Sequence, residues 1–102
     1  MQEISVIELK SLIDQDPNTQ LIDVREPDER AAFHIGGTFL PLGKIMNFEL
    51  DSIEDLKDQA VYVYCRSGKR SLQACMMLEQ AGFTRVHNVS GGILAWQEQF
   101  GN

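Results

Sequence analysis

The stretch AVYVYCRSGKRSLQACMMLEQA, residues 60–81, decides the fold, because it joins the strongest strand signal in the chain to the strongest helix signal. Residues 60–64 are mostly β-branched or aromatic, which predicts a buried strand. Residues 71–81 contain no glycine, proline or β-branched residue and are followed by Gly82, which predicts a helix. This helix is apolar on nearly all sides, so we expect it to be buried. Cys65 stands immediately after the strand.

Shorter patterns on both sides of this stretch alternate between helix and strand. Ser5 and Glu8 match a capping box before apolar residues at helical spacing, which predicts a first helix over residues 6–15. The other predicted elements are a strand at 21–24, a helical stretch from Pro27, an edge strand at 38–40, a weakly helical acidic segment at 48–58, a strand at 85–89 and a helix at 93–100. This alternation predicts an α/β fold with a mainly parallel sheet of four to five strands and helices on both faces. Sites in such folds form at the carboxyl ends of strands.

Length and charge limit the function. A chain of 102 residues fits one domain, so we expect residues 1–102 to fold around a single core. Its formal net charge of −6 would repel a phosphate backbone, which argues against nucleic acid as a partner. No run approaches the roughly 18 apolar residues that span a bilayer, and the first residues lack the pattern of a signal peptide. We therefore expect a cytoplasmic protein that does not bind a membrane.

The cysteine and histidine spacings match neither a zinc site nor a C-x-x-C redox pair. The sequence therefore predicts a reduced compartment, no structural metal and no cofactor. Cys75 is interpreted as a packing residue, with a resolving thiol as the alternative. It lies on the order of 15 Å of helical rise from Cys65, too far for a disulfide without unfolding. His34 and His87 are expected to be structural or exposed, and Trp96 and Phe100 to lie in the core. The acidic residues between 49 and 58 are expected to form a solvated face, with a docking patch for a basic partner as the alternative.

The loop after the strand carries the candidate chemistry. Residues 59–78 include no acidic residue but contain Arg66, Lys69 and Arg70, so the rest of the chain carries −9. A loop that turns into a helix N-terminus directs backbone N–H groups inward and favours an anion. The same groups lower the pKa of a thiol at that place, which predicts that Cys65 is a nucleophile for an anionic substrate. Gly68 suits a loop that must fold tightly around an anion.

Four segments of the chain resemble, in order, the signatures of single-domain rhodaneses. These segments are IDVREPDE at 22–29, HIGG at 34–37, CRSGKRS at 65–71 and GGILAW at 91–96. The resemblance covers nearly the whole chain and implies a single rhodanese-like domain with thiosulfate sulfurtransferase activity. It implies that Cys65 attacks the outer sulfur of thiosulfate, that sulfite leaves, and that the persulfide passes its sulfur to cyanide or a thiol.

The resemblance also assigns roles to individual residues. It implies that the amides of residues 66–70 hold the persulfide and that Arg66 and Arg70 attract the substrate. The implied substrate-binding residues are Arg66, Ser67, Gly68, Lys69, Arg70 and Ser71. Asp23 and Arg25 are implied to form a structural pair near the site. One segment departs from the family pattern: Ile35 runs into Gly36 without the usual proline, the stretch to Pro41 is one residue shorter, and Phe33 stands where glycine is usual.

Three other functions compete with this interpretation. Cysteine phosphatases and arsenate reductases use Cys-x5-Arg, but Ser71 occupies that arginine position and the arginine comes one residue earlier. A shorter loop suits one sulfur atom better than a tetrahedral phosphate. A P-loop would need a glycine where Val63 stands. A sulfur-relay or regulatory module that delivers the persulfide to a thiol protein remains the main alternative to a free-standing enzyme.

Overall fold

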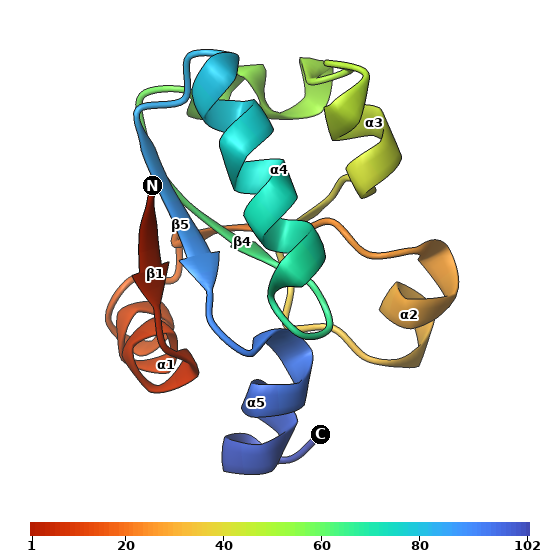
Figure 1. The fold of residues 1–102 in the computed structure, drawn as a ribbon. Coiled ribbons are helices and arrows are strands. Elements are labelled where there is room, and N and C mark those ends of the chain that lie inside the picture. Colours follow the sequence, from red (N-terminus) through yellow and green to blue (C-terminus); the bar gives the residue numbers. More distant parts are fainter.

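The predicted strand at residues 60–64 lies at the centre of a five-stranded sheet in the computed structural model, which describes residues 1–102 (Figure 1). The strands are β1 (Gln2–Ile4), β2 (Gln20–Asp23), β3 (Thr38–Phe39), β4 (Ala60–Tyr64) and β5 (Arg85–Val89), arranged in the order β1-β5-β4-β2-β3. The helices are α1 (Val6–Gln15), α2 (Pro27–Ala32), α3 (Leu42–Met46), the 3-10 helix η1 (Asp51–Leu56), α4 (Lys69–Gln80) and α5 (Gly92–Phe100). Every strand pairing is parallel, so the predicted α/β fold is confirmed.

The carboxyl ends of the three central strands meet at one edge of the sheet. Asp23 of β2 is in register with Tyr64 of β4, and Val63 of β4 is in register with Asn88 of β5. Cys65 follows Tyr64 directly, so the chain leaves β4 between the ends of its two neighbours. This is the place where ligands bind in open parallel sheets.

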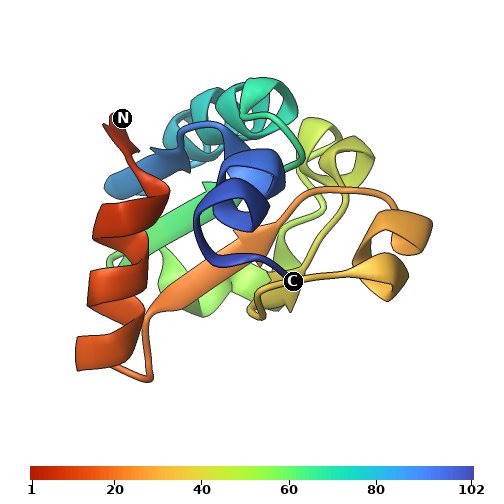
Figure 2. The ribbon, with the colours of Figure 1, turned by 90° about the horizontal axis from the view of Figure 1, so that it is seen from below.

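Successive side chains of β4 face two different layers of helices. Val63 lies in a core cluster with Leu78 of α4, which also includes residues of α3 and η1. Tyr64 lies in a second cluster with Leu9 of α1 and Trp96 of α5. Helices therefore cover both faces of the sheet, with α1 and α5 on the face opposite α4 (Figure 2). None of these helices combines the length and the apolar character needed to cross a membrane.

Two predictions about burial are wrong. On α4, which was expected to be buried nearly all round, Leu72 and Met76 are 37% and 54% exposed. The helix packs through its other side, because a helix laid on one face of a sheet leaves its outer side in solvent. Phe100 was assigned to the core but is 40% exposed, since it is the last residue of α5 and contacts Trp96 from outside, with ring centroids 4.8 Å apart.

Two short elements have no signal in the sequence. The three residues of β1 form a strand by pairing with β5, and Glu3 lies beside Asn88 across 85 positions of sequence. The five-residue helix α3 begins after Pro41 and contains Gly43, which lowers its intrinsic helix preference. By contrast, the first helix and its capping box between Ser5 and Glu8 are confirmed.

Candidate active site

Cys65 lies in a tight loop between β4 and the N-terminus of α4. The residue is 1% exposed. The backbone N–H groups of Gly68 and Ser71 donate to its Sγ over 3.1 and 3.3 Å, and the thiol donates to Ser71 Oγ over 3.3 Å. Gly68 makes this turn at a φ of 99°, in the region that favours glycine. The loop thus directs amide donors at the sulfur, which is the arrangement that stabilises an anion.

The surroundings of Cys65 favour its thiolate. Burial is the strongest influence and would raise the pKa of the thiol. The Ser71 hydroxyl and the backbone N–H groups of Ser71, Gly68 and Ser67 together outweigh it, so the pKa is lowered. The predicted direction is therefore confirmed. The leading causes of the lowering are neutral hydrogen bonds, and no arginine of the loop is among them.

The start of α5 holds the backbone of this loop from the other side. The N–H groups of Ile93 and Leu94 donate to the carbonyl oxygens of Cys65 and Arg66 over 2.9 and 3.0 Å. Gly92, with a φ of 56°, allows this contact, because a Cβ there would lie 2.4 Å from the Cys65 oxygen and 2.6 Å from the Arg66 oxygen. The glycine pair before the last helix is therefore part of the support of the active-site loop.

A chain of buried polar side chains extends from the sulfur to the end of β5. The Ser71 hydroxyl donates to Asn88 Oδ1, and Asn88 Nδ2 donates to the carbonyl oxygen of Gly68 over 3.1 Å. Asn88 Nδ2 also lies 3.1 and 3.2 Å from the carboxylate oxygens of Glu3, which accepts a further bond from Ser90. No sequence motif singled out Asn88 or Glu3, because their role follows from the pairing of β1 and β5.

The cations of the loop are not equivalent. Arg66 and Lys69 are exposed, as is Ser67. Arg70 instead forms a two-pronged ion pair with Glu29 of α2, at 2.7 and 2.8 Å. The bond from Arg70 lowers the pKa of Glu29 to about 2, against the opposing influence of burial. Sequence reasoning missed Glu29, which lies 41 positions away from its partner.

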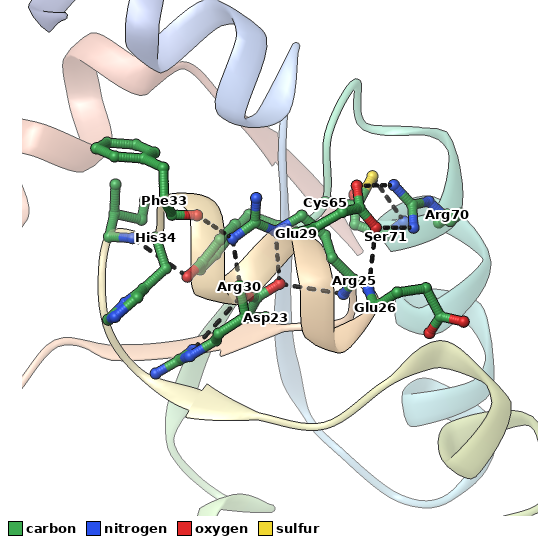
Figure 3. Close-up of polar contacts among 12 residues, drawn as sticks. Asp23, Arg25, Glu26, Glu29, Arg30, Phe33, His34, Cys65, Arg70 and Ser71 are labelled. Atoms are coloured by element: carbon green, nitrogen blue, oxygen red, sulfur yellow. Dashed lines mark hydrogen bonds and ion pairs between the residues drawn. The ribbon is translucent and has the colours of Figure 1, made fainter. Parts of the chain in front are cut away.

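Asp23 and Arg25 form a buried pair beside the loop (Figure 3). Arg25 donates to both carboxylate oxygens of Asp23 over 2.9 and 3.0 Å and to the carbonyl oxygen of Phe33 over 2.7 Å. Arg30 approaches the same carboxylate at 3.5 Å. These bonds connect the end of β2 to the segment that follows α2, and neither Asp23 nor Arg25 forms a hydrogen bond with the Cys65 sulfur.

Residues 5–99 of the chain match the family model of the rhodanese-like domain. The chain belongs to the rhodanese-like domain family. A sulfurtransferase of Allochromatium vinosum is 39% identical over 97 residues, covering 94% of this chain and 88% of that protein. The crystal structure of a rhodanese-like domain protein from Staphylococcus aureus has a TM-score of 0.83 and 32% identity, covering 94% of this chain and 91% of that one. The human single-domain sulfurtransferase TSTD1 has a TM-score of 0.81 and 27% identity, covering 97% of each chain.

The segment that departs from the rhodanese pattern, residues 33–41, is held in place by hydrogen bonds to Tyr64. The Tyr64 hydroxyl donates to the Gly36 carbonyl oxygen over 2.9 Å, and the Ile35 N–H donates to that hydroxyl over 3.4 Å. At Gly37, with a φ of 86°, a Cβ would lie 2.3 Å from the Leu21 carbonyl oxygen. Two glycines and a buried tyrosine thus lead the chain into β3 without the usual proline.

The remaining candidate residues of the rhodanese-like domain make no hydrogen bond with the Cys65 sulfur. Cys75 is fully buried on the inner side of α4, burial raises its pKa to about 12, and both cysteines are free. His34 is exposed and accepts a bond from the Gly36 N–H. His87 stacks on Tyr62 with ring centroids 4.6 Å apart. The structure therefore gathers Cys65 and its loop with residues of β2, α2 and β5, and leaves these three side chains outside the site.

Proposed function

We propose that this rhodanese-like protein transfers sulfane sulfur from thiosulfate, or from a persulfide donor, to a thiol or cyanide acceptor through a persulfide on Cys65. The observation that supports this most strongly is the position of the Cys65 sulfur, where amide donors and the Ser71 hydroxyl converge and lower the thiol pKa. A thiolate is the nucleophilic form of cysteine. The homologous sulfurtransferases make sulfur transfer the reaction class to expect.

The first step joins the Cys65 thiolate to the outer sulfur of the donor. In thiosulfate the S–S bond breaks, sulfite leaves with the electron pair, and Cys65 becomes a persulfide. In this proposal the amides of residues 66–70 hold the added sulfur, since loop N–H groups at a helix N-terminus stabilise negative charge. The bonds from the Gly68 and Ser71 N–H groups to the Cys65 Sγ support this role. Arg66 and Lys69 are exposed and can attract an anionic donor.

The second step returns the enzyme to its starting form. Cyanide attacks the outer sulfur of the persulfide, thiocyanate leaves, and the Cys65 thiolate is regenerated. A thiol acceptor takes the sulfur in the same way and becomes a persulfide itself. Neither step needs a general acid, because each leaving group departs as a stable anion, and no cofactor takes part.

Mass spectrometry of the Cys65 peptide tests this function. Treatment with thiosulfate should add one sulfur atom to that peptide, and cyanide should remove it. Cys65→Ala and Cys65→Ser should abolish thiosulfate:cyanide transfer, whereas Cys75→Ala should retain most of it, because Cys75 is buried and its pKa is raised to about 12. A Cys65→Ala protein that still catalysed thiosulfate:cyanide transfer would disprove this proposal.

A second candidate is a sulfur relay to one protein partner. It is favoured by the exposed Leu72 and Met76 on α4, the helix that begins at the active-site loop, because exposed apolar side chains suit a protein acceptor. Turnover with small thiols, compared with turnover to a thiol protein, separates the two candidates. We propose the cytoplasm as the compartment, where thiols remain reduced.

A further inference from the structure

The ion pair between Glu29 and Arg70 places a carboxylate at the active-site loop. Both terminal nitrogens of Arg70 bond to Glu29, one to each carboxylate oxygen, so the guanidinium group is occupied (Figure 3). Glu29 also accepts the Glu26 N–H over 3.0 Å, which fixes its side chain to the first turn of α2. The carboxylate is therefore a built part of the site, held from two sides.

This pairing changes the charge that a substrate meets. Glu29 is ionised throughout the neutral range, because its bond with Arg70 lowers its pKa to about 2. It compensates one of the three cations of the loop. The Cys65 charge also acts on Arg70, where it is among the causes that raise the pKa of the guanidinium group. Arg70 thus lies within the electrostatic reach of the reacting sulfur and already carries an anionic partner.

Sulfane donors differ in the charge that they bring to this loop. Thiosulfate is a dianion, and it must approach a thiolate and the Glu29 carboxylate together. An organic persulfide or thiosulfonate has the same reactive outer sulfur with at most one negative charge. Repulsion from a fixed charge grows in proportion to the charge of the donor, so Glu29 penalises thiosulfate most.

We propose that Glu29 is a specificity-determining residue, which acts through Arg70 to select sulfane donors of at most one negative charge over the thiosulfate dianion. The selected class is organic persulfides and thiosulfonates. The inference rests on the proposed transfer through Cys65. In the step, the Cys65 thiolate attacks the outer sulfur of R–S–SH, the S–S bond breaks, RS⁻ leaves with the electron pair, and Cys65 holds the outer sulfur with its proton.

The test compares two donors that differ by one charge. Methanethiosulfonate has a methyl group in place of one charged oxygen of thiosulfate and releases a sulfinate instead of sulfite. Glu29→Gln removes the charge with little change in shape, and its amide oxygen can still accept the Glu26 N–H. Asp28→Asn is the matched control, because Asp28 is exposed on the same helix and makes no ion pair.

We expect Glu29→Gln to raise kcat/KM for thiosulfate about tenfold, mainly through a lower KM, and to change kcat/KM for methanethiosulfonate by less than about threefold. Asp28→Asn should leave the ratio of the two donors as in the wild type. The inference is wrong if Glu29→Gln changes both donors by the same factor or lowers the activity with thiosulfate. It is also wrong if Asp28→Asn shifts the ratio as much as Glu29→Gln.

Failure of the underlying function gives a different result. If the wild-type protein takes sulfur from neither donor, no persulfide appears on the Cys65 peptide and both proposals fall. If the persulfide forms from both donors and the ratio does not respond to Glu29→Gln, the transfer function stands and only the role of Glu29 is rejected.

Discussion

Ser71 contacts the Cys65 sulfur with two groups, its backbone N–H and its hydroxyl. In the thiol form the hydroxyl accepts from Cys65 and donates to Asn88. A hydroxyl proton can rotate, so it is able to turn toward the sulfur when the thiol ionises. Ionisation of Cys65 is therefore coupled to the Ser71 hydroxyl, a group that the resemblance names only as part of a substrate-binding residue.

Removing this hydroxyl should weaken the thiolate. Ser71→Ala keeps the backbone N–H, and a hydrogen bond of about 0.5–1.5 kcal/mol is lost, so alkylation by iodoacetamide at neutral pH should slow about three- to tenfold. The rate measured against pH should show a higher Cys65 pKa. Ser67→Ala is the control, because Ser67 acts through its backbone N–H, which the substitution keeps. Equal Cys65 pKa values in the two variants would show that the Ser71 hydroxyl does not stabilise the thiolate.

Arg70 should matter through the charge balance that it maintains with Glu29. Arg70→Ala leaves the Glu29 carboxylate uncompensated beside the loop, so kcat/KM for thiosulfate should fall about tenfold, with a raised KM and a raised Cys65 pKa. Lys69→Ala should have a smaller effect, since its side chain is exposed. Steady-state kinetics at two salt concentrations and the alkylation profile measure the two effects. If neither KM nor the pKa moved, the amides would act alone.

The sequence predicts the residues of this site that are local and misses those that are distant. Cys65, Gly68 and the cations lie within one loop, where spacing and charge were enough to propose a nucleophile. Asn88 and Glu29 reach the loop from 20 and 41 positions away, so their contacts depend on strand order and on the direction of α2. A single sequence contains no local pattern that links such partners.

Gly92 is needed because the start of α5 lies against the backbone of the active-site loop. Gly92→Ala should lower the free energy of unfolding by about 1–3 kcal/mol and displace the active-site loop, because its Cβ would meet the Cys65 and Arg66 carbonyl oxygens. Gly43→Ala in α3 is the control: nothing lies within 4 Å of its Cβ, and alanine favours a helix. Urea unfolding measures both. A Gly92→Ala protein as stable as Gly43→Ala would contradict the close approach of α5.

The length of the loop between β4 and α4 should exclude phosphate monoesters. Because α4 begins at Lys69, Arg70 lies in its first turn and is engaged by Glu29, where a phosphatase loop would have one more residue before its arginine. We expect negligible hydrolysis of p-nitrophenyl phosphate, which is measured by the release of nitrophenol. Efficient turnover that disappears in Cys65→Ser would instead favour the phosphatase interpretation.

Strands with a strong local sequence signal form within the predicted bounds. β4 and β5 are bounded as expected, because alternating β-branched and aromatic residues or a flanking turn define them. β1 has three residues, two of them exposed, and its existence depends on β5. The outer side of α4 carries Leu72 and Met76, so its apolar composition alone gave the wrong burial.

Across the whole molecule, the net charge of −6 is the sum of a cationic segment, residues 59–78, and an acidic remainder. Residues 59–78, which contain three cations and no acidic residue, include the loop around Cys65. In the folded chain, Glu29 of α2 forms an ion pair with Arg70 of that loop. Net charge and segregation could be read from the sequence, whereas the pairing that corrects the local charge could not, because it is a property of the assembled fold.

The same pair should make the stability of the whole domain depend on pH in acid. The pKa of Glu29 falls from 4.5 to about 2 on folding, because Arg70 bonds to its carboxylate. A lowered pKa in the folded state stabilises the protein above pH 4.5, and this contribution is lost as the pH falls toward 2. Both side chains are partly exposed, at 22% and 35%, so solvent limits the contribution to about 1 kcal/mol.

Glu29→Gln should therefore be less stable than the wild type at pH 7 by about 1 kcal/mol, and the two proteins should approach equal stability near pH 2. Urea unfolding at pH 7, 4 and 2.5 measures the difference between them. Asp28→Asn, which changes the same charge on the same helix without an ion pair, should stay close to the wild type at each pH. A difference between Glu29→Gln and the wild type that stayed constant down to pH 2 would mean that the carboxylate stabilises the fold by its shape and its bond to Glu26. In that case the charge of Glu29 would affect only the choice of donor and not the stability of the fold.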